Sequence, residues 1–160
     1  MAAQKDNFVV VLCVDQSEHS EFTFKWYLRH AHRPENKLHI VHVPEHTSEV
    51  SILTSSTKLQ ELSENSKQMT DRLMENYIQW STQNGIPDAK FAHPQGKEEW
   101  HEIIKYAEKV GAGLIVIGSR GQGKLRRTFL GSVSDSVLHH SPVPVLVCRK
   151  KEDNPIQPSH

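Results

Sequence analysis

The chain has 160 residues, 36% of them hydrophobic, and its 19 Lys and Arg residues balance its 19 Asp and Glu residues to a formal net charge of +0. This length fits one domain with its own core, and the balanced charge gives no indication of a nucleic-acid or membrane-surface protein. Two isolated cysteines, Cys13 and Cys148, a polar N-terminus and the lack of an apolar run of about 18 residues predict a cytoplasmic protein without a membrane partner.

The first apolar run, residues 8–14, reads FVVVLCV, the pattern of a strand that is covered on both faces in a parallel sheet. Asp15 ends this run, and Ser17 opens an amphipathic helix that stops before Pro34. Because open α/β sheets bind ligands at the carboxyl ends of their strands, we expect Asp15 to contact a ligand. The alternative is that Asp15 only caps the helix.

The middle of the chain continues this alternation. Residues 38–43 predict a second strand, and residues 44–57 predict a loop. A long helix is expected from about residue 58 to Gly85, with its aromatic residues in the core. Residues 89–93 predict a weak strand, followed by a helix that Gly111 ends.

A glycine-rich segment follows the fourth predicted strand, residues 114–117. Its pattern is Gly118, two residues, Gly121, nine residues, Gly131 and Ser132. Because glycine lacks a Cβ, we expect backbone N–H groups here to approach a bulky anion in conformations that a larger residue would resist. Ser132 opens the last helix, residues 132–140, whose free N–H groups and dipole favour a phosphate. The same serine could also be an ordinary helix cap.

Residues 118–124 also match the first seven positions of the P-loop of nucleoside triphosphatases. The eighth position is Leu125, where that motif needs a Ser or Thr hydroxyl to bind magnesium. The P-loop interpretation is therefore rejected. Lys124, Arg126 and Arg127 lie between the second and third glycines, where one or two of them could reach a phosphate.

Five strands alternating with four helices predict a doubly wound α/β domain with right-handed crossovers. The last strand, residues 144–149, is apolar, and such a strand at a sheet edge needs to be covered or paired. Pairing with its own copy, between Val143 and Cys148, predicts a homodimer. Residues 6–150 are the expected domain, between a flexible N-terminus at 1–5 and a disordered tail at 151–160.

The chain resembles the universal stress protein family over about residues 6–149. The similar segments are VDQSEHS after the first strand, HVPE after the second, the G-x2-G-x9-G-S pattern and the closing SPVPVLVCR. The resemblance implies a Rossmann-like fold, with an open five-stranded parallel sheet in the order 3-2-1-4-5, helices on both faces and a homodimer joined through the fifth strands. It also implies the subgroup that binds ATP, because the glycine pattern is complete; AMP or ADP and magnesium are further candidates.

The resemblance also assigns the binding residues by position. Val14 and Asp15 would meet the ribose and adenine, Val43 would give backbone contacts to adenine, Ile117 and Gly118 would line the base and sugar, and Gly121, Gly131, Ser132 and Val133 would take the phosphates. Arg120 stands where the family often has His, and it could add a phosphate contact. No catalytic residue and no direct metal ligand is assigned, although Asp15 could hold magnesium through water.

The leading hypothesis is an ATP-binding regulatory module of the stress response with little or no rapid catalysis. One alternative is a slow ATPase or a nucleotidyl-transferring enzyme, for which Asp15 and Asp135 are the candidate carboxylates. A second alternative is a nucleotide-free dimerising adaptor.

Overall fold

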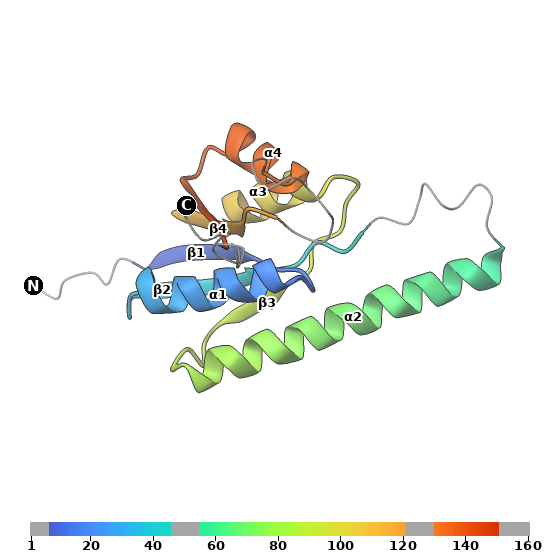
Figure 1. The fold of residues 1–160 in the computed structure, drawn as a ribbon, viewed down its shortest axis with the longest axis horizontal. Helices are drawn as coiled ribbons and strands as arrows, with labels where there is room; N and C mark the ends of the chain where they lie inside the picture. The colour runs from blue at the N-terminus through green and yellow to red at the C-terminus, as the bar shows by residue number, and fades with distance from the viewer. Residues whose placement is uncertain (1–6, 46–54, 121–129, 151–160) are drawn as a thin grey trace, which may run out of the picture.

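The computed structural model describes residues 7–45, 55–120 and 130–150 (Figure 1). The predicted terminal segments 1–5 and 151–160, most of the predicted loop 44–57 and the whole of 121–129, including Gly121, lie outside the described residues. Strands and helices alternate along the described chain: β1 (Phe8–Cys13), α1 (Glu18–His30), β2 (Asn36–Val41), α2 (Ser56–Gln83), β3 (Lys90–Ala92), α3 (Glu99–Lys109), β4 (Leu114–Gly118), α4 (Ser132–His140) and β5 (Val145–Cys148).

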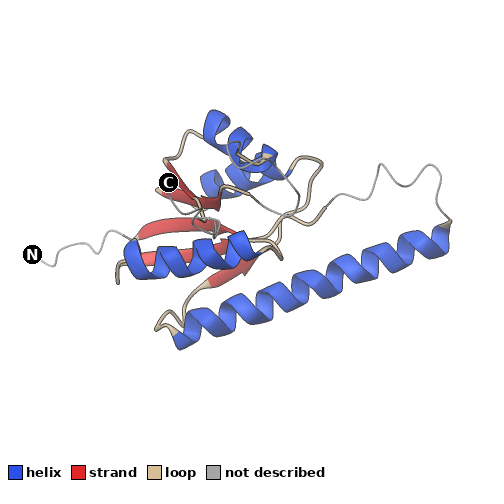
Figure 2. Cartoon of the chain, viewed as in Figure 1, coloured by secondary structure: helices blue, strands red, loops and turns tan. Residues whose placement is uncertain are grey.

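The strands form one sheet, drawn in red in Figure 2. The sheet is parallel, and its strand order is β3-β2-β1-β4-β5. This is the predicted order, and β1 is central as its apolar run indicated. Cys13 of β1 lies opposite Val41 of β2, and Leu12 lies opposite Val116 of β4. The carboxyl ends of the strands therefore meet at one edge of the sheet, which is where open α/β sheets bind their ligands.

Helices cover both faces of the sheet, as predicted. On one face, which α1 and α2 cover (Figure 1), Val10 belongs to a buried cluster that includes Phe24 of α1 and Tyr77 of α2. On the other face Val11 belongs to a second cluster with Ile103 of α3. Neighbouring residues of a strand point to opposite faces, so β1 contributes to both clusters. Fully burying such a side chain stabilises the fold by about 1.5–3 kcal/mol.

Two glycines end helices in the way the sequence predicted. Gly85 follows α2 with φ of 80°, and Gly111 follows α3 with φ of 66°. An L-residue rarely adopts these left-handed angles, whereas glycine does so without a steric penalty. Both helix ends therefore depend on the missing Cβ.

The longest described helix, α2, packs on the sheet only through its carboxyl-terminal half. Its buried residues are Thr70, Leu73, Tyr77 and Ser81. The amino-terminal half extends past the carboxyl edge of the sheet (Figure 1). Within the described residues, neither this helix nor any other is long and apolar enough to cross a membrane.

Candidate functional site

A cleft of about 430 Å³ lies at the carboxyl edge of the sheet. The carboxyl ends of β1, β2 and β4 and the residues that follow them line the cleft, together with residues of α2, α3 and α4. Its volume lies within the range of about 300–1,000 Å³ that is typical of small-molecule sites.

The cleft brings together the residues that the sequence assigned to one site. The lining residues include Val14, Asp15, Val43, Ile117, Gly118, Arg120, Gly131, Ser132 and Val133. Of the assigned residues only Gly121 is absent from this set, because it lies outside the described residues. The contact of each of them with a nucleotide stays a prediction.

Hydrogen bonds fix the backbone at the β4–α4 end of the cleft. The Gly131 N–H donates to the Ser119 carbonyl over 2.7 Å, and the Ser119 N–H donates to the Cys148 carbonyl over 2.8 Å. The buried Ser134 hydroxyl lies 3.1 Å from the Ser119 carbonyl oxygen and 3.0 Å from that of Gly131. These bonds hold the backbone after β4, at Ser119, and before α4, at Gly131, in fixed positions at this end of the cleft. Ser134 was missed by the sequence analysis.

The amino end of α4 corrects the cap interpretation of Ser132. Gly131 is the N-cap residue, and it offers no side-chain hydrogen bond to the first turn. Ser132 is the first helical residue, and its side chain is exposed at the cleft. The cap residue therefore accepts no side-chain hydrogen bond from the first N–H groups of α4. Free N–H groups at a helix amino terminus favour the binding of an anion.

The two described glycines of the motif do not need unusual backbone angles, so that part of the prediction was wrong. Gly131 has φ of −60° and ψ of 155°, which any residue can adopt, and Gly118 is not among the positive-φ residues. A Cβ on Gly118 would lie 2.9 Å from the Thr23 Oγ1 of α1. Gly118 is therefore required by the packing of β4 on α1. A Cβ on Gly131 would meet its nearest neighbour, the Ser119 carbonyl oxygen, at 3.4 Å.

Asp15 lies in the cleft and shapes the start of α1 without capping it. Its Oδ1 accepts hydrogen bonds from the Ser17 N–H over 2.8 Å and from the Ser17 hydroxyl. Ser17 is the N-cap, since its hydroxyl oxygen accepts from the Ser20 N–H. The capping alternative for Asp15 was wrong. Among the described residues, only one of its two carboxyl oxygens is used in these bonds.

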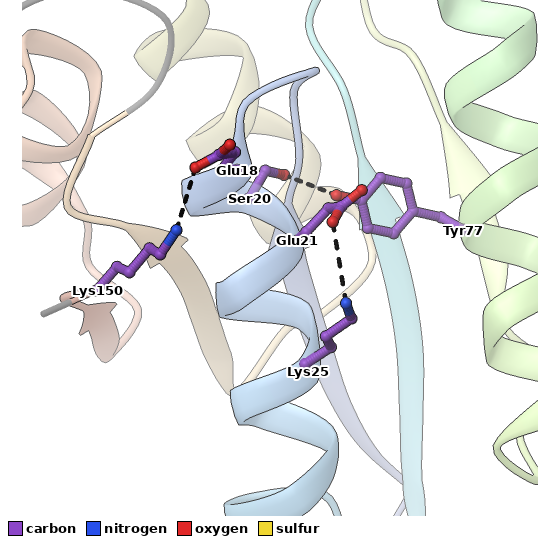
Figure 3. Close-up of polar contacts among 6 residues, drawn as sticks. All are labelled: Glu18, Ser20, Glu21, Lys25, Tyr77 and Lys150. Atoms are coloured by element: carbon purple, nitrogen blue, oxygen red, sulfur yellow. Dashed lines mark hydrogen bonds and ion pairs between the residues drawn. The ribbon is translucent and has the colours of Figure 1, made fainter. Parts of the chain in front are cut away.

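A buried hydroxyl pair joins α1 to α2 beside this carboxylate. The Ser20 hydroxyl accepts from the Asp15 N–H over 2.9 Å and lies 3.0 Å from the Tyr77 hydroxyl (Figure 3). Burial raises the pKa of Tyr77 to about 12, so the phenol stays protonated. Figure 3 also draws two exposed ion pairs, Lys25 with Glu21 and Lys150 with Glu18, and pairs of this kind contribute little to stability.

The β1–β2 end of the cleft combines apolar walls with titratable groups. His42 is buried, and its Nδ1 lies 2.9 Å from the Val14 carbonyl oxygen. Because a carbonyl only accepts, this nitrogen carries the hydrogen. Burial lowers the pKa of His42 and keeps the ring neutral. Burial also raises the pKa of the Cys13 thiol to about 12, which leaves it unreactive.

Helix α2 contributes residues that the sequence analysis did not assign to the site. Leu62, Asn65, Ser66 and Met69 line the cleft. Asn65 and Met69 also line a second hollow of about 400 Å³, between α2 and the start of α1, and Asp15 borders both spaces. The spacing of these residues places them on one side of the helix. This spacing was the only feature of the sequence that could have indicated their place in the cleft.

The structure bears on the two carboxylates that the sequence analysis considered for catalysis, Asp15 and Asp135. Asp135 does not line the cleft; its exposed side chain lies 3.3 Å from the Nε2 of His139 on the same helix. Among the described residues, no group of three or more His, Cys, Asp or Glu side chains is placed to hold a metal ion. Of the two carboxylates considered from the sequence, only Asp15 lines the cleft, and its role in holding a magnesium ion through water stays a prediction.

Comparisons with known proteins agree with this architecture. The model of the universal stress protein family matches residues 8–149. A relative from Staphylococcus aureus (strain USA300), named as a universal stress protein, is 29% identical over 143 residues, covering 89% of this chain and 84% of the relative. The solved structure of the hypothetical protein MJ0577 is 26% identical with a TM-score of 0.79, covering 92% of this chain and 99% of that chain.

Two similar solved structures are described as nucleotide complexes. A universal stress protein in complex with cAMP is 21% identical with a TM-score of 0.66, covering 90% of this chain and 98% of that chain. The universal stress protein from Archaeoglobus fulgidus in complex with dAMP is 21% identical with a TM-score of 0.60, covering 88% of this chain and 96% of that chain.

Proposed function

The chain belongs to the universal stress protein family, and we propose that it binds an adenine nucleotide, ATP in particular, in the cleft at the carboxyl edge of its sheet. The observation that carries the proposal is the polarity of this cleft. One end offers the uncapped amino terminus of α4 together with Ser132, and the other end offers apolar walls from β1 and β2. A phosphate chain fits the first end, and a flat base fits the second.

The orientation of the nucleotide follows from the positions of these groups. The phosphates would lie against the amides of Gly131, Ser132 and Val133, with Arg120 as a further partner. The ribose would lie beside Asp15, which has a carboxyl oxygen that described residues leave unused. Adenine would contact the backbone at Val43. The complexes of family members with cAMP and dAMP support this class of ligand.

We propose that the protein has a regulatory role and does not turn over nucleotide rapidly. In this role the bound nucleotide changes the conformation of the protein or its contacts with partners. The position of Asp135 outside the cleft weakens the enzyme alternative, because only Asp15 of its two candidate carboxylates lines the cleft. If magnesium binds, Asp15 would hold it through water and it would neutralise phosphate charge. A hydrolysis rate that falls to background in Asp15→Ala, while ATP still binds, would favour the enzyme.

A homodimer in the cytoplasm is the proposed assembly and location. β5 is an edge strand, and its residues Val145, Leu146 and Val147 are only partly buried. Pairing of two copies through this edge would cover its apolar side chains and unpaired backbone groups. Both cysteines are free and buried, which suits a reducing compartment.

The proposal is tested by mass spectrometry of small molecules released when the purified full-length protein is denatured, together with thermal unfolding of the nucleotide-stripped protein. We expect an adenine nucleotide in the released fraction and a higher melting temperature when ATP is added, because a ligand that binds only the folded state stabilises it. The absence of both signals would favour the nucleotide-free adaptor.

A further inference from the structure

Glu99 is a cleft carboxylate to which the family resemblance assigns no role. It is the first residue of α3, it lines the cleft and it is only partly exposed. The carboxylate accepts no hydrogen bond and forms no ion pair with residues in the described ranges. The preceding residue, Glu98, has the same charge but is exposed and does not line the cleft. Two adjacent glutamates thus differ in their access to a ligand.

Packing places this carboxylate near the ends of β1 and β2, because Ile103, one turn after Glu99 on α3, belongs to the buried cluster that contains Cys13 and Val43. Glu99 is near enough to Cys13 to raise the pKa of that thiol, with a stronger effect than Asp15. Burial, then the charges of Glu45 and Asp15, raise the pKa of Glu99 itself. Cys13 ends β1, Asp15 follows β1 and Glu45 follows β2. Glu99 therefore lies near the carboxyl ends of β1 and β2. Gly131 and Ser132 lie beyond β4, at the opposite end.

The chemistry of an ionised carboxylate restricts what can lie against it. It accepts hydrogen bonds and donates none, and together with Asp15 and Glu45 it repels phosphate. The part of a nucleotide at this end must therefore be uncharged and must present N–H or O–H donors. Ribose lies next to the phosphates and so comes nearest to Asp15, whereas the base reaches farther toward β2. Cys13, Ile103 and other apolar residues surround this position, and they suit a flat ring.

We propose that Glu99 determines base specificity in this cleft, by accepting a hydrogen bond from the exocyclic amino group of adenine. This inference rests on the proposed function, because it concerns the same site. Adenine carries its 6-amino group on the base edge, so one carboxylate oxygen facing that edge recognises the donor. A purine without the amino group would leave the carboxylate desolvated and without a partner, which is the arrangement that gives strong discrimination.

The test compares ATP with purine riboside 5′-triphosphate, which has hydrogen in place of the 6-amino group. Both are titrated calorimetrically into the full-length wild-type chain, Glu99→Ala and the matched control Glu98→Ala. A hydrogen bond to a charged group predicts that the wild type binds ATP about 10- to 100-fold more tightly than the analogue. In Glu99→Ala the two affinities should become nearly equal, mainly through weaker ATP binding, while Glu98→Ala should keep the wild-type ratio.

The remaining outcomes are also decisive. An affinity ratio that is near one in the wild type, or is unchanged in Glu99→Ala, would overturn the role of Glu99 although nucleotide still binds. An equal loss of ratio in Glu98→Ala would assign the effect to charge at the start of α3 and would also overturn it. If Glu99→Ala fails to fold, Glu99→Gln keeps the side-chain volume, and the ratio should then fall several-fold. Failure of the wild type to bind either compound would refute the proposed function itself.

Discussion

Replacing Gly118 is expected to weaken the fold, whereas replacing Gly131 is expected to leave the fold intact and to remove nucleotide binding. The Cβ of an alanine at 118 would lie 2.9 Å from the Thr23 Oγ1, which is fully buried and donates a hydrogen bond to the His19 carbonyl over 2.7 Å. The hydroxyl is held by that bond, so it cannot move away freely. Overpacking of this kind costs about 1–3 kcal/mol.

The loss of chain entropy in the unfolded state partly offsets this cost. Exchanging Gly for Ala stabilises a protein by about 0.4–1 kcal/mol where the backbone angles permit it. The net expectation for Gly118→Ala is a free energy of unfolding lower by about 1–2 kcal/mol, or a melting temperature lower by roughly 2–8 °C at this chain length. Urea denaturation measures the first quantity directly.

Gly131→Val provides the contrast. The nearest atom to a Cβ there is the Ser119 carbonyl oxygen at 3.4 Å, and the backbone angles of −60° and 155° suit valine. Because Gly131 is buried and is the N-cap of α4, where valine is less favourable than glycine, we expect the fold to be kept with a free energy of unfolding lower by about 1 kcal/mol. The larger side chain fills space beside the proposed phosphate position and should abolish ATP binding.

A double mutant tests the assigned cause at Gly118. In Gly118→Ala/Thr23→Ala the clashing hydroxyl is absent, so the combined loss of stability should fall short of the sum of the two single losses by about 1 kcal/mol. Strict additivity would refute the packing explanation. Wild-type ATP affinity in Gly131→Val would show that the phosphates bind elsewhere.

Further predictions concern the α1–α2 contact, pH and assembly. Tyr77→Phe removes the hydroxyl contact with Ser20 and should lower the free energy of unfolding by about 0.5–1.5 kcal/mol in urea titrations; an unchanged value would mean that this bond adds no net stability. The pKa of His42 is lowered from 6.5 in the folded state, so the unfolded chain takes up the proton more readily. The contribution of His42 to stability is therefore complete above about pH 6.5 and is lost as the pH falls toward the folded-state pKa; His42→Asn should flatten this part of the stability profile, and an unchanged slope would contradict the assignment. Val145→Lys places a charge on the edge strand and should convert a dimer to a monomer in sedimentation measurements, whereas a monomeric wild type at micromolar concentration would refute pairing through β5.

The sequence predicts the order of elements because the strong signals are local. The run at residues 8–14 is apolar without alternation, and such a strand must be covered on both faces, which places it at the centre of the sheet. Gly85 and Gly111 mark helix ends because only glycine adopts their angles at low cost. The prediction of the strand order and of the residues gathered at the carboxyl edge came from the resemblance together with this alternation.

The parts that were missed depend on contacts between segments far apart in the chain. No local pattern shows that Gly118 faces Thr23, so the glycine was explained by backbone angles when the reason is packing between β4 and α1. Helical spacing separates Glu99 from Glu98, because Glu99 shares a side of α3 with the buried Ile103 and Ala107, but this spacing does not show that the side faces a ligand cleft. The role of Asn65 in the cleft similarly depends on how far α2 extends past the sheet edge.

Calorimetric titration of ATP into the nucleotide-stripped full-length protein tests the central claim most directly. The account predicts saturable binding of one ATP per chain in the wild type and no binding in Gly131→Val that is folded at the temperature of the titration. Saturable binding that is identical in both proteins, or no heat with ATP, ADP or AMP in a folded wild type, would contradict it.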